Sequence, residues 1–130
     1  MFRIAITSII NILTMSACRE EQTPSGGSVV CTPSIVPGIR IEVLDREEGF
    51  AISCGIVASI IDGDYSEQLE NPADSECFDT QMLTGAFERK GVYDVSVSKV
   101  GYRDWSVTDV DVFANVCHVN TITIQVYLEK

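Results

Sequence analysis

Positive charge is scarce in this sequence. Lys and Arg number nine against nineteen Asp and Glu, which gives a formal net charge of −10. Binding to a phosphate backbone requires clustered Lys and Arg, so the composition argues against nucleic acid as a partner. A glycine-rich phosphate loop, a pair of histidines and zinc-type cysteine spacing are also missing from the sequence. We therefore expect no cofactor and no metal site.

A long apolar run is missing as well. The apolar run at residues 4–13 covers about ten residues, whereas a membrane-spanning helix needs roughly twenty. Arg3 precedes this run, and the small residues Ser16 and Ala17 separate it from Cys18. A short basic start, an apolar run and small residues are the parts of an export signal. We therefore assign residues 1–17 to a cleaved signal peptide.

The end of this signal resembles a known processing site. Residues 13–18 read Leu-Thr-Met-Ser-Ala-Cys and resemble the lipobox of bacterial lipoproteins. The resemblance implies a diacylglyceryl thioether at Cys18, cleavage before it and acylation of the new amino terminus. The alternative is an ordinary secretory signal. Arg19 stands where an Asp retains Gram-negative lipoproteins in the inner membrane, so a Gram-negative source favours the outer membrane.

The cysteine count fits an extracytoplasmic lipoprotein. Five cysteines are an odd number, and an unpaired thiol is a liability in an oxidising compartment. Lipidation of Cys18 leaves four cysteines, which allow three pairings. We favour Cys54–Cys77, which closes an acidic loop at 62–76, and Cys31–Cys117, whose members precede the first and last strands. Free core thiols are the alternative.

The remaining chain is long enough for one domain. Residues 19–29 are polar and contain Gly, Ser and Pro, a composition that does not bury enough apolar surface to fold. We therefore expect residues 18–35 to be the lipidated amino terminus and a flexible tether. Residues 36–130 then form a single domain.

Hydrophobic periodicity indicates that this domain is all-β. Residues 39–43, 93–97 and 122–128 alternate apolar and polar side chains with a period of two, which is typical of strands with one buried face. Residues 55–61 are apolar on both faces and predict a more central strand. A phase break between Val107 and Val110 predicts a bulge near Asp109. Short strands and turn signals without a long helical pattern indicate an antiparallel β-sandwich.

One segment resembles a known domain family. Residues 91–102 read Gly-Val-Tyr-Asp-Val-Ser-Val-Ser-Lys-Val-Gly-Tyr and look like the G-x-Y-x-V-x-V-x-x-x-G-Y signature of carboxypeptidase regulatory-like domains. Residues 43–49, the turn at 62–63 and residues 117–122 are also consistent with this family. The resemblance covers about residues 36–130. It implies a seven-stranded, Greek-key, transthyretin-like sandwich that acts as an accessory unit rather than an enzyme.

Few side chains are candidates for chemistry. His118 is the only histidine and has no nucleophile or second ligand at an interpretable spacing, so we expect a structural role rather than a base or metal ligand. Seven acids between Asp62 and Asp79 raise the question of calcium, but a solvated acidic loop is the favoured interpretation. Tyr102, Trp105 and Tyr127 are candidate ligand contacts if they are exposed, and core residues otherwise.

These observations define one leading hypothesis and one alternative. We expect a non-catalytic binding or structural module that is anchored to the membrane of the bacterial cell envelope by the lipid at Cys18. The alternative is a carbohydrate-binding module that uses exposed aromatic side chains. An envelope protein that contacts a sheet edge or a loop is a further candidate partner. An enzyme would need a cleft with converging polar groups, and the sequence offers no recognisable set.

Overall fold

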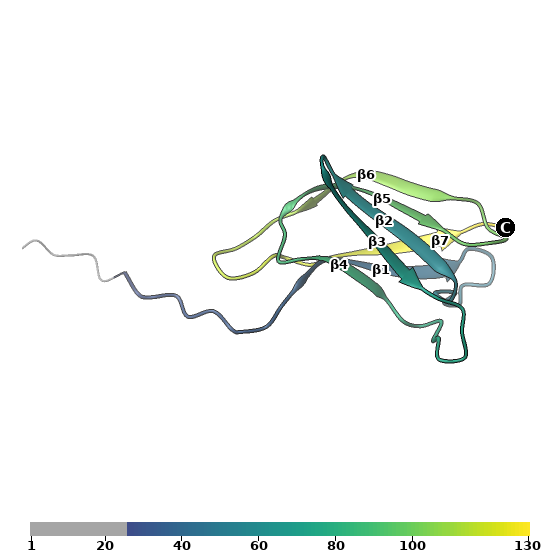
Figure 1. Cartoon of the computed structure of the whole chain (residues 1–130), viewed down its shortest axis with the longest axis horizontal. Helices are drawn as coiled ribbons and strands as arrows, with labels where there is room; N and C mark the ends of the chain where they lie inside the picture. Colours follow the sequence, from purple (N-terminus) through teal and green to yellow (C-terminus); the bar gives the residue numbers. More distant parts are fainter. Residues whose placement is uncertain (1–25) are drawn as a thin grey trace, which may run out of the picture.

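The structure is a computed structural model that describes residues 26–130, so the candidate lipidation site Cys18 lies outside the described residues. This part of the chain is all-β, as the periodicity predicts, and contains no helix long and apolar enough to cross a membrane. Its seven strands are β1 (Pro37–Asp45), β2 (Ile56–Asp62), β3 (Tyr65–Asn71), β4 (Leu83–Phe87), β5 (Gly91–Ser98), β6 (Trp105–Val112) and β7 (Ile122–Leu128) (Figure 1).

The strands form two sheets that face each other as in a β-sandwich. One sheet has the order β4-β1-β7 and the other has the order β3-β2-β5-β6. The prediction of an antiparallel fold is wrong at one place, because β1 and β7 pair in parallel. Alternating side chains report which face of a strand is buried but not its direction. Each connection reverses the chain, so β7, which follows β1 after six connections, runs in the same direction as β1.

The core is built from the alternating residues that the sequence identifies. Ile39, Ile41 and Val43 of β1 belong to the same buried cluster as the inner side chains of β5, and Val126 and Leu128 of β7 extend this cluster. Tyr93, Val95 and Val97 are the buried residues of β5. The period-two prediction is therefore confirmed for these three strands.

Strand β2 lies between β3 and β5, so its predicted central position is confirmed. However, only Ile56, Ala58 and Ile60 are buried, whereas Val57 and Ile61 are exposed on the outer face. In a two-layer fold the second sheet covers only one face of each strand. Apolar residues on both faces therefore indicate a central strand here, but not a strand that is buried on both sides.

The sequence analysis interprets residues 62–76 as a single acidic loop, and this interpretation is wrong. A hairpin at Gly63, whose φ is +56°, turns the chain into β3, which pairs along all of β2. Glu67 is half-buried on the inner side of β3, where it accepts hydrogen bonds from the Tyr65 hydroxyl at 2.5 Å and the Ala86 amide at 3.0 Å. These partners explain how an acidic segment pairs as an edge strand.

The bulge predicted near Asp109 is present. Tyr93 pairs with Val110 and Val95 pairs with Val107, so β6 has one more residue than β5 between these pairs. Asp109 has a φ of +58°, in the left-handed region. This extra residue returns Val110 and Val112 to the inner face after Val107.

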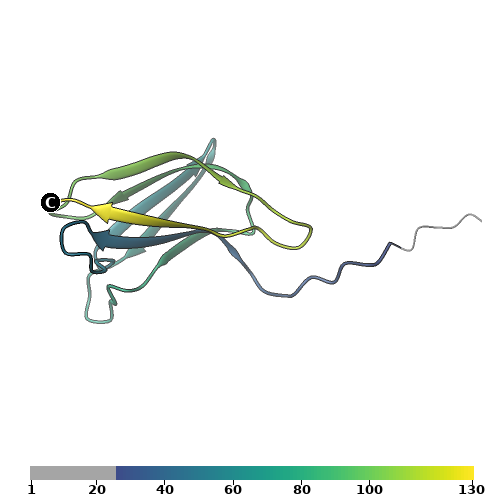
Figure 2. The ribbon, with the colours of Figure 1, turned by 180° about the vertical axis from the view of Figure 1, so that it is seen from behind.

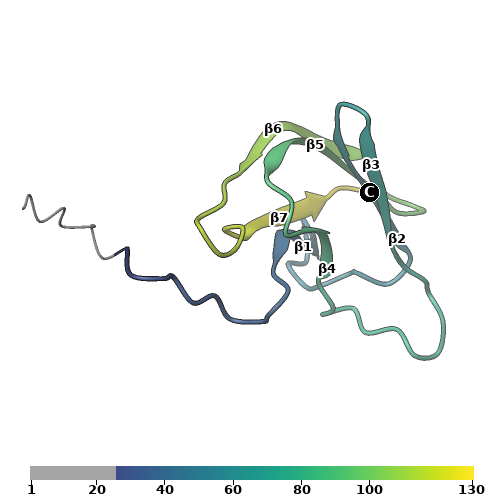
Figure 3. The same ribbon diagram turned by 60° about the vertical axis from the view of Figure 1, so that its left-hand side comes forward.

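The sandwich has two distinct ends. Residues 26–36, which we call the strap, enter at one end together with the 113–121 loop and the 88–90 turn (Figures 1 and 2). We call the opposite end the distal end. It carries loops 46–55, 72–82 and 99–104 and the carboxyl terminus (Figure 3). Each end therefore gathers segments that are distant in the sequence.

One disulfide lies at each end. Cys31–Cys117 joins the strap to the 113–121 loop across a sequence separation of 86, and Cys54–Cys77 joins two distal loops across a separation of 23. These are the two pairings that the sequence analysis favours. Two disulfides in a chain of this size indicate an oxidising, extracytoplasmic environment.

A glycine in β4 offers a test of how closely the two sheets pack at this edge. A Cβ at Gly85 would lie 2.8 Å from Ile60 Cδ1 and 3.0 Å from Glu67 Oε1. We expect Gly85→Ala to lower the free energy of unfolding by about 1–3 kcal/mol, measured by urea denaturation. Gly27→Ala is the control, because nothing lies within 4 Å of the added Cβ. Equal stabilities of the two variants would contradict the packing described.

Candidate functional site

A shallow depression at the distal end brings together two of the three aromatic residues proposed from the sequence. Trp105 opens β6 and Tyr127 lies near the end of β7, and both line a cavity of about 240 Å³. The same depression is lined by Arg46, Arg103, Asp104, Leu128 and Glu129. Strands β1 and β7 end at the distal end and β6 begins there, which is why these residues meet.

Backbone and ion-pair contacts hold the walls of the depression. The Arg46 guanidinium lies 3.1 Å from the Glu129 carboxylate, and the Arg46 amide donates to the Leu128 carbonyl at 3.0 Å. The Arg103 amide donates to the Glu129 carbonyl at 2.7 Å. The depression therefore combines two aromatic side chains with guanidinium and carboxylate groups. That set supplies stacking surface and hydrogen-bonding partners for a polar ligand.

The sequence analysis does not identify the polar residues of the depression. Arg46, Arg103, Asp104 and Glu129 all lie just outside a strand, where charged residues are common on any solvated surface. The available signal is weak: Arg103 and Asp104 directly precede Trp105, and Glu129 lies two residues after Tyr127, but Arg46 has no aromatic residue beside it in the sequence. Only the tertiary structure, in which the ends of β1 and β7 meet the start of β6, shows that these residues line one depression.

Tyr102 does not line the depression. Its hydroxyl donates a hydrogen bond to Asp45 Oδ2 at 2.7 Å, and Asp45 is buried at the end of β1. Asp45 Oδ1 accepts the amides of Glu47 and Glu48, each at 2.9 Å. The Glu48 amide, followed by the Tyr102 hydroxyl, lowers the pKa of Asp45 from its ordinary value. In turn, the hydrogen bond to Asp45 raises the pKa of Tyr102 to about 12.

The distal loops are fastened to one another. The Cys54–Cys77 disulfide links loops 46–55 and 72–82, and Asp79 accepts the Cys54 amide at 3.0 Å through its carboxylate. The Asp79 carbonyl accepts the Ser53 amide at 3.1 Å. The Lys99 ammonium donates to the Cys54 carbonyl, so the 99–104 loop joins the same group. A cross-linked set of loops is preordered, which reduces the entropy lost on binding.

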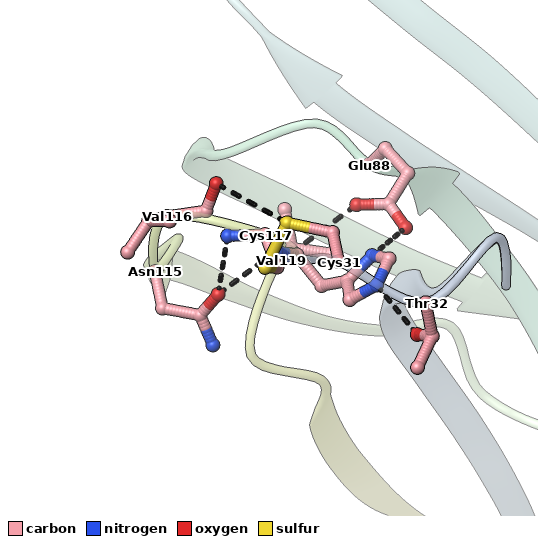
Figure 4. The surroundings of a disulfide bond; sticks show 8 residues. Cys31, Thr32, Glu88, Asn115, Val116, Cys117 and Val119 are labelled. Carbon is pink, nitrogen blue, oxygen red and sulfur yellow. Dashed lines mark hydrogen bonds and ion pairs between the residues drawn. A yellow bond between two sulfur atoms is a disulfide. The ribbon is translucent and has the colours of Figure 1, made fainter. Parts of the chain in front are cut away.

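His118 has the structural surroundings that we expect from the sequence. Its Nε2 lies 3.0 Å from the Thr32 hydroxyl, and its Nδ1 lies 2.7 Å from Glu88 Oε1. Glu88 also accepts the Val36 amide at 2.8 Å, and this bond is the main cause of its lowered pKa. Figure 4 shows Glu88 and Thr32 beside the Cys31–Cys117 disulfide. The cluster holds the strap against the domain.

The acids at 62–79 are distributed rather than gathered. Asp62 pairs with the Arg89 guanidinium at 2.9 Å, and Asp74 accepts the Glu76 amide at 2.9 Å in a distal loop. Asp79 bonds to the Cys54 amide, as described above. Within residues 26–130, no group of three or more His, Cys, Asp or Glu residues is close enough to hold a metal ion.

The comparisons with known proteins add no relative. No protein-family model matches the chain, and no curated protein is similar to it. The resemblances to bacterial lipoproteins and to carboxypeptidase regulatory-like domains therefore remain predictions from the residues that carry them.

The contact between Asp45 and Tyr102 generates a prediction about acid stability. A depressed pKa means that the Asp45 carboxylate stabilises the fold above its unfolded-state pKa, and that this contribution is lost as the pH falls through the folded-state pKa. Tyr102→Phe removes one cause of the depression. We therefore expect the stability difference between the wild type and this variant to be larger at about pH 6 than at about pH 2.5.

Urea unfolding at the two pH values measures this difference. Tyr127→Phe is the matched control, because its hydroxyl lies 3.5 Å from the exposed Gln125 and makes no contact with Asp45. A stability loss in Tyr102→Phe that is the same at both pH values would show that Tyr102 does not stabilise the fold through the Asp45 carboxylate.

Proposed function

We propose that this chain is a lipid-anchored, extracytoplasmic and non-catalytic binding or structural module of the bacterial cell envelope. Its fold is proposed to be a Greek-key sandwich of the carboxypeptidase regulatory-like, transthyretin-like type. The observation that carries the proposal is the pairing of Cys31 with Cys117 and of Cys54 with Cys77. The four cysteines of the described residues pair with each other. The fifth, Cys18, is the residue at which the lipobox-like sequence predicts lipid.

The arrangement of the two ends supports this proposal. The strap leads from the amino-terminal side of the chain into β1, and the Cys31–Cys117 disulfide fixes it to the 113–121 loop. An anchor at Cys18 would therefore hold the strap end towards a membrane and direct the distal end away from it (Figure 1). For a Gram-negative source we propose the outer membrane, because Arg19 and not Asp follows the cysteine.

The non-catalytic assignment rests on how the candidate side chains are used. Both ring nitrogens of His118 are engaged, one with Thr32 and the other with Glu88. A general base needs a reacting group within hydrogen-bond reach, and these partners hold the strap instead. The distal depression has a volume of about 240 Å³ and lies at the surface among strand ends, which suits binding better than reactions that require exclusion of water.

A second candidate function is carbohydrate binding at the distal depression. The favouring observation is that Trp105 and Tyr127 line one cavity together with Arg103 and Asp104. Sugar rings present an apolar face that stacks on aromatic rings, and their hydroxyls bond to charged and amide groups. An oligosaccharide of the cell envelope is the ligand class that this set fits.

The anchor is tested through the fate of Cys18. In a bacterial host, the wild-type chain is expected to start at residue 18, to carry diacylglyceryl and amino-terminal acyl groups in its intact mass, and to sediment with membranes. Cys18→Ala is expected to release the chain from the membrane fraction, because no lipid is attached. A wild-type protein recovered from the cytosol with an uncut leader would contradict the proposal.

The carbohydrate alternative is tested through Trp105, the only tryptophan of the chain. If the depression binds sugar, envelope oligosaccharides shift the tryptophan emission, and Arg103→Gln weakens binding by about tenfold, the loss of one charge-assisted hydrogen bond. Arg40→Gln is the control, because Arg40 lies on β1 and does not line the depression. An unchanged emission spectrum across an oligosaccharide panel would remove this alternative.

A further inference from the structure

Two segments that meet at the strap end differ in composition from the rest of the chain. Residues 26–39 and 112–128 contain no Asp, Glu, Lys or Arg, although 22% of the chain is charged. The first segment includes the strap, and the second includes the 113–121 loop. The Cys31–Cys117 disulfide joins them, so the two uncharged segments form one continuous part of the molecule.

This part of the molecule exposes large apolar side chains. Phe113 is 60% exposed and Val116 is 75% exposed in the loop, and Val30 is 88% exposed in the strap. Val29 and Ile35 of the strap are exposed as well. Single exposed apolar residues are ordinary, but several on two cross-linked segments without charge mark an interaction surface. We call these five residues the apolar rim.

Several polar groups at the tip of the loop are bonded within the loop. Asn115 Oδ1 accepts the amides of Cys117 and His118 at 2.8 and 2.9 Å, and the Asn115 amide donates to the His118 carbonyl at 2.9 Å. Asn115 and the backbone of Val116 lie beside the disulfide in Figure 4. These internal bonds lower the cost of moving the tip into a less polar medium.

We propose that the apolar rim is a membrane-docking surface that enters the interfacial region of a lipid bilayer. The proposal rests on the proposed lipid anchor at Cys18. Cys31 follows Cys18 by thirteen positions in the sequence, and an extended chain of that length spans at most about 45 Å. The anchor therefore keeps the rim near the bilayer at a high effective concentration, so that even weak apolar contacts are populated.

The charge distribution favours a lipid surface as the occupant. Glu47, Glu48, Asp74 and Glu76 lie in the distal loops, at the far end from the rim. Near the rim, Glu88 bonds to His118, and Arg89 pairs with Asp62. These four carboxylates are thus turned away from lipid headgroups. Docking through the rim would fix the orientation of the domain and leave the Trp105 depression facing away from the membrane.

Brominated lipids measure contact with the bilayer, because bromine on the acyl chains quenches nearby tryptophan. The test uses the full lipidated chain in phosphatidylcholine vesicles, with Trp105→Phe to remove the native fluorophore. Phe113→Trp then reports from the rim. Val100→Trp, at an exposed distal position, is the matched control. We expect brominated acyl chains to quench the rim probe by at least about twofold and to leave the distal probe unchanged.

The outcomes separate this proposal from the anchor. Lipid at Cys18 in the intact mass, with equal emission of both probes in brominated and ordinary vesicles, would overturn the docking surface alone. A rim probe shielded from aqueous acrylamide but not quenched by brominated lipid would also overturn it, because protein would then cover the rim. A chain without lipid would overturn the anchor and the docking surface together. Val116→Trp replaces Phe113→Trp if that variant does not fold.

Discussion

The pairing of β1 with two partners is the constraint on which the rest of the structure depends. Strand β1 bonds to β4 on one side and to β7 on the other, while its inner residues Ile39, Ile41 and Val43 are buried against the second sheet. Its first residue follows the strap, and its last residue is Asp45 at the distal end. Both ends of the molecule are therefore fixed relative to each other through this strand.

Each end of β1 is secured by different chemistry. At the strap end, the Cys31–Cys117 disulfide, Glu88 and His118 hold the incoming chain. At the distal end, the buried Asp45 carboxylate binds the following turn and the Tyr102 hydroxyl. A domain stiffened in this way transmits orientation from its attachment point to its far loops. That property suits a module which presents its distal loops in a fixed geometry relative to its strap end.

The sequence is informative where a residue pattern has one physical interpretation. Alternating apolar residues predict the inner faces of β1, β5 and β7, and the phase break at Asp109 predicts a bulge, because each pattern has one low-energy solution. It is less informative for β3, where alternating acids are compatible with a loop. The pairing of that segment with β2, and the bonds from Tyr65 and Ala86 to Glu67, make it a strand.

The sequence by itself determined the all-β class, the buried face of each strongly alternating strand and the favoured cysteine pairs, because these follow from local periodicity and from cysteine positions relative to strands. Only the tertiary structure decided the parallel direction of β7, the strand β3 and the meeting of Arg46, Arg103, Trp105 and Tyr127 in one depression. The physical reason is that strand pairing, relative strand direction and side-chain convergence arise from contacts between residues far apart in the sequence, which local patterns do not record.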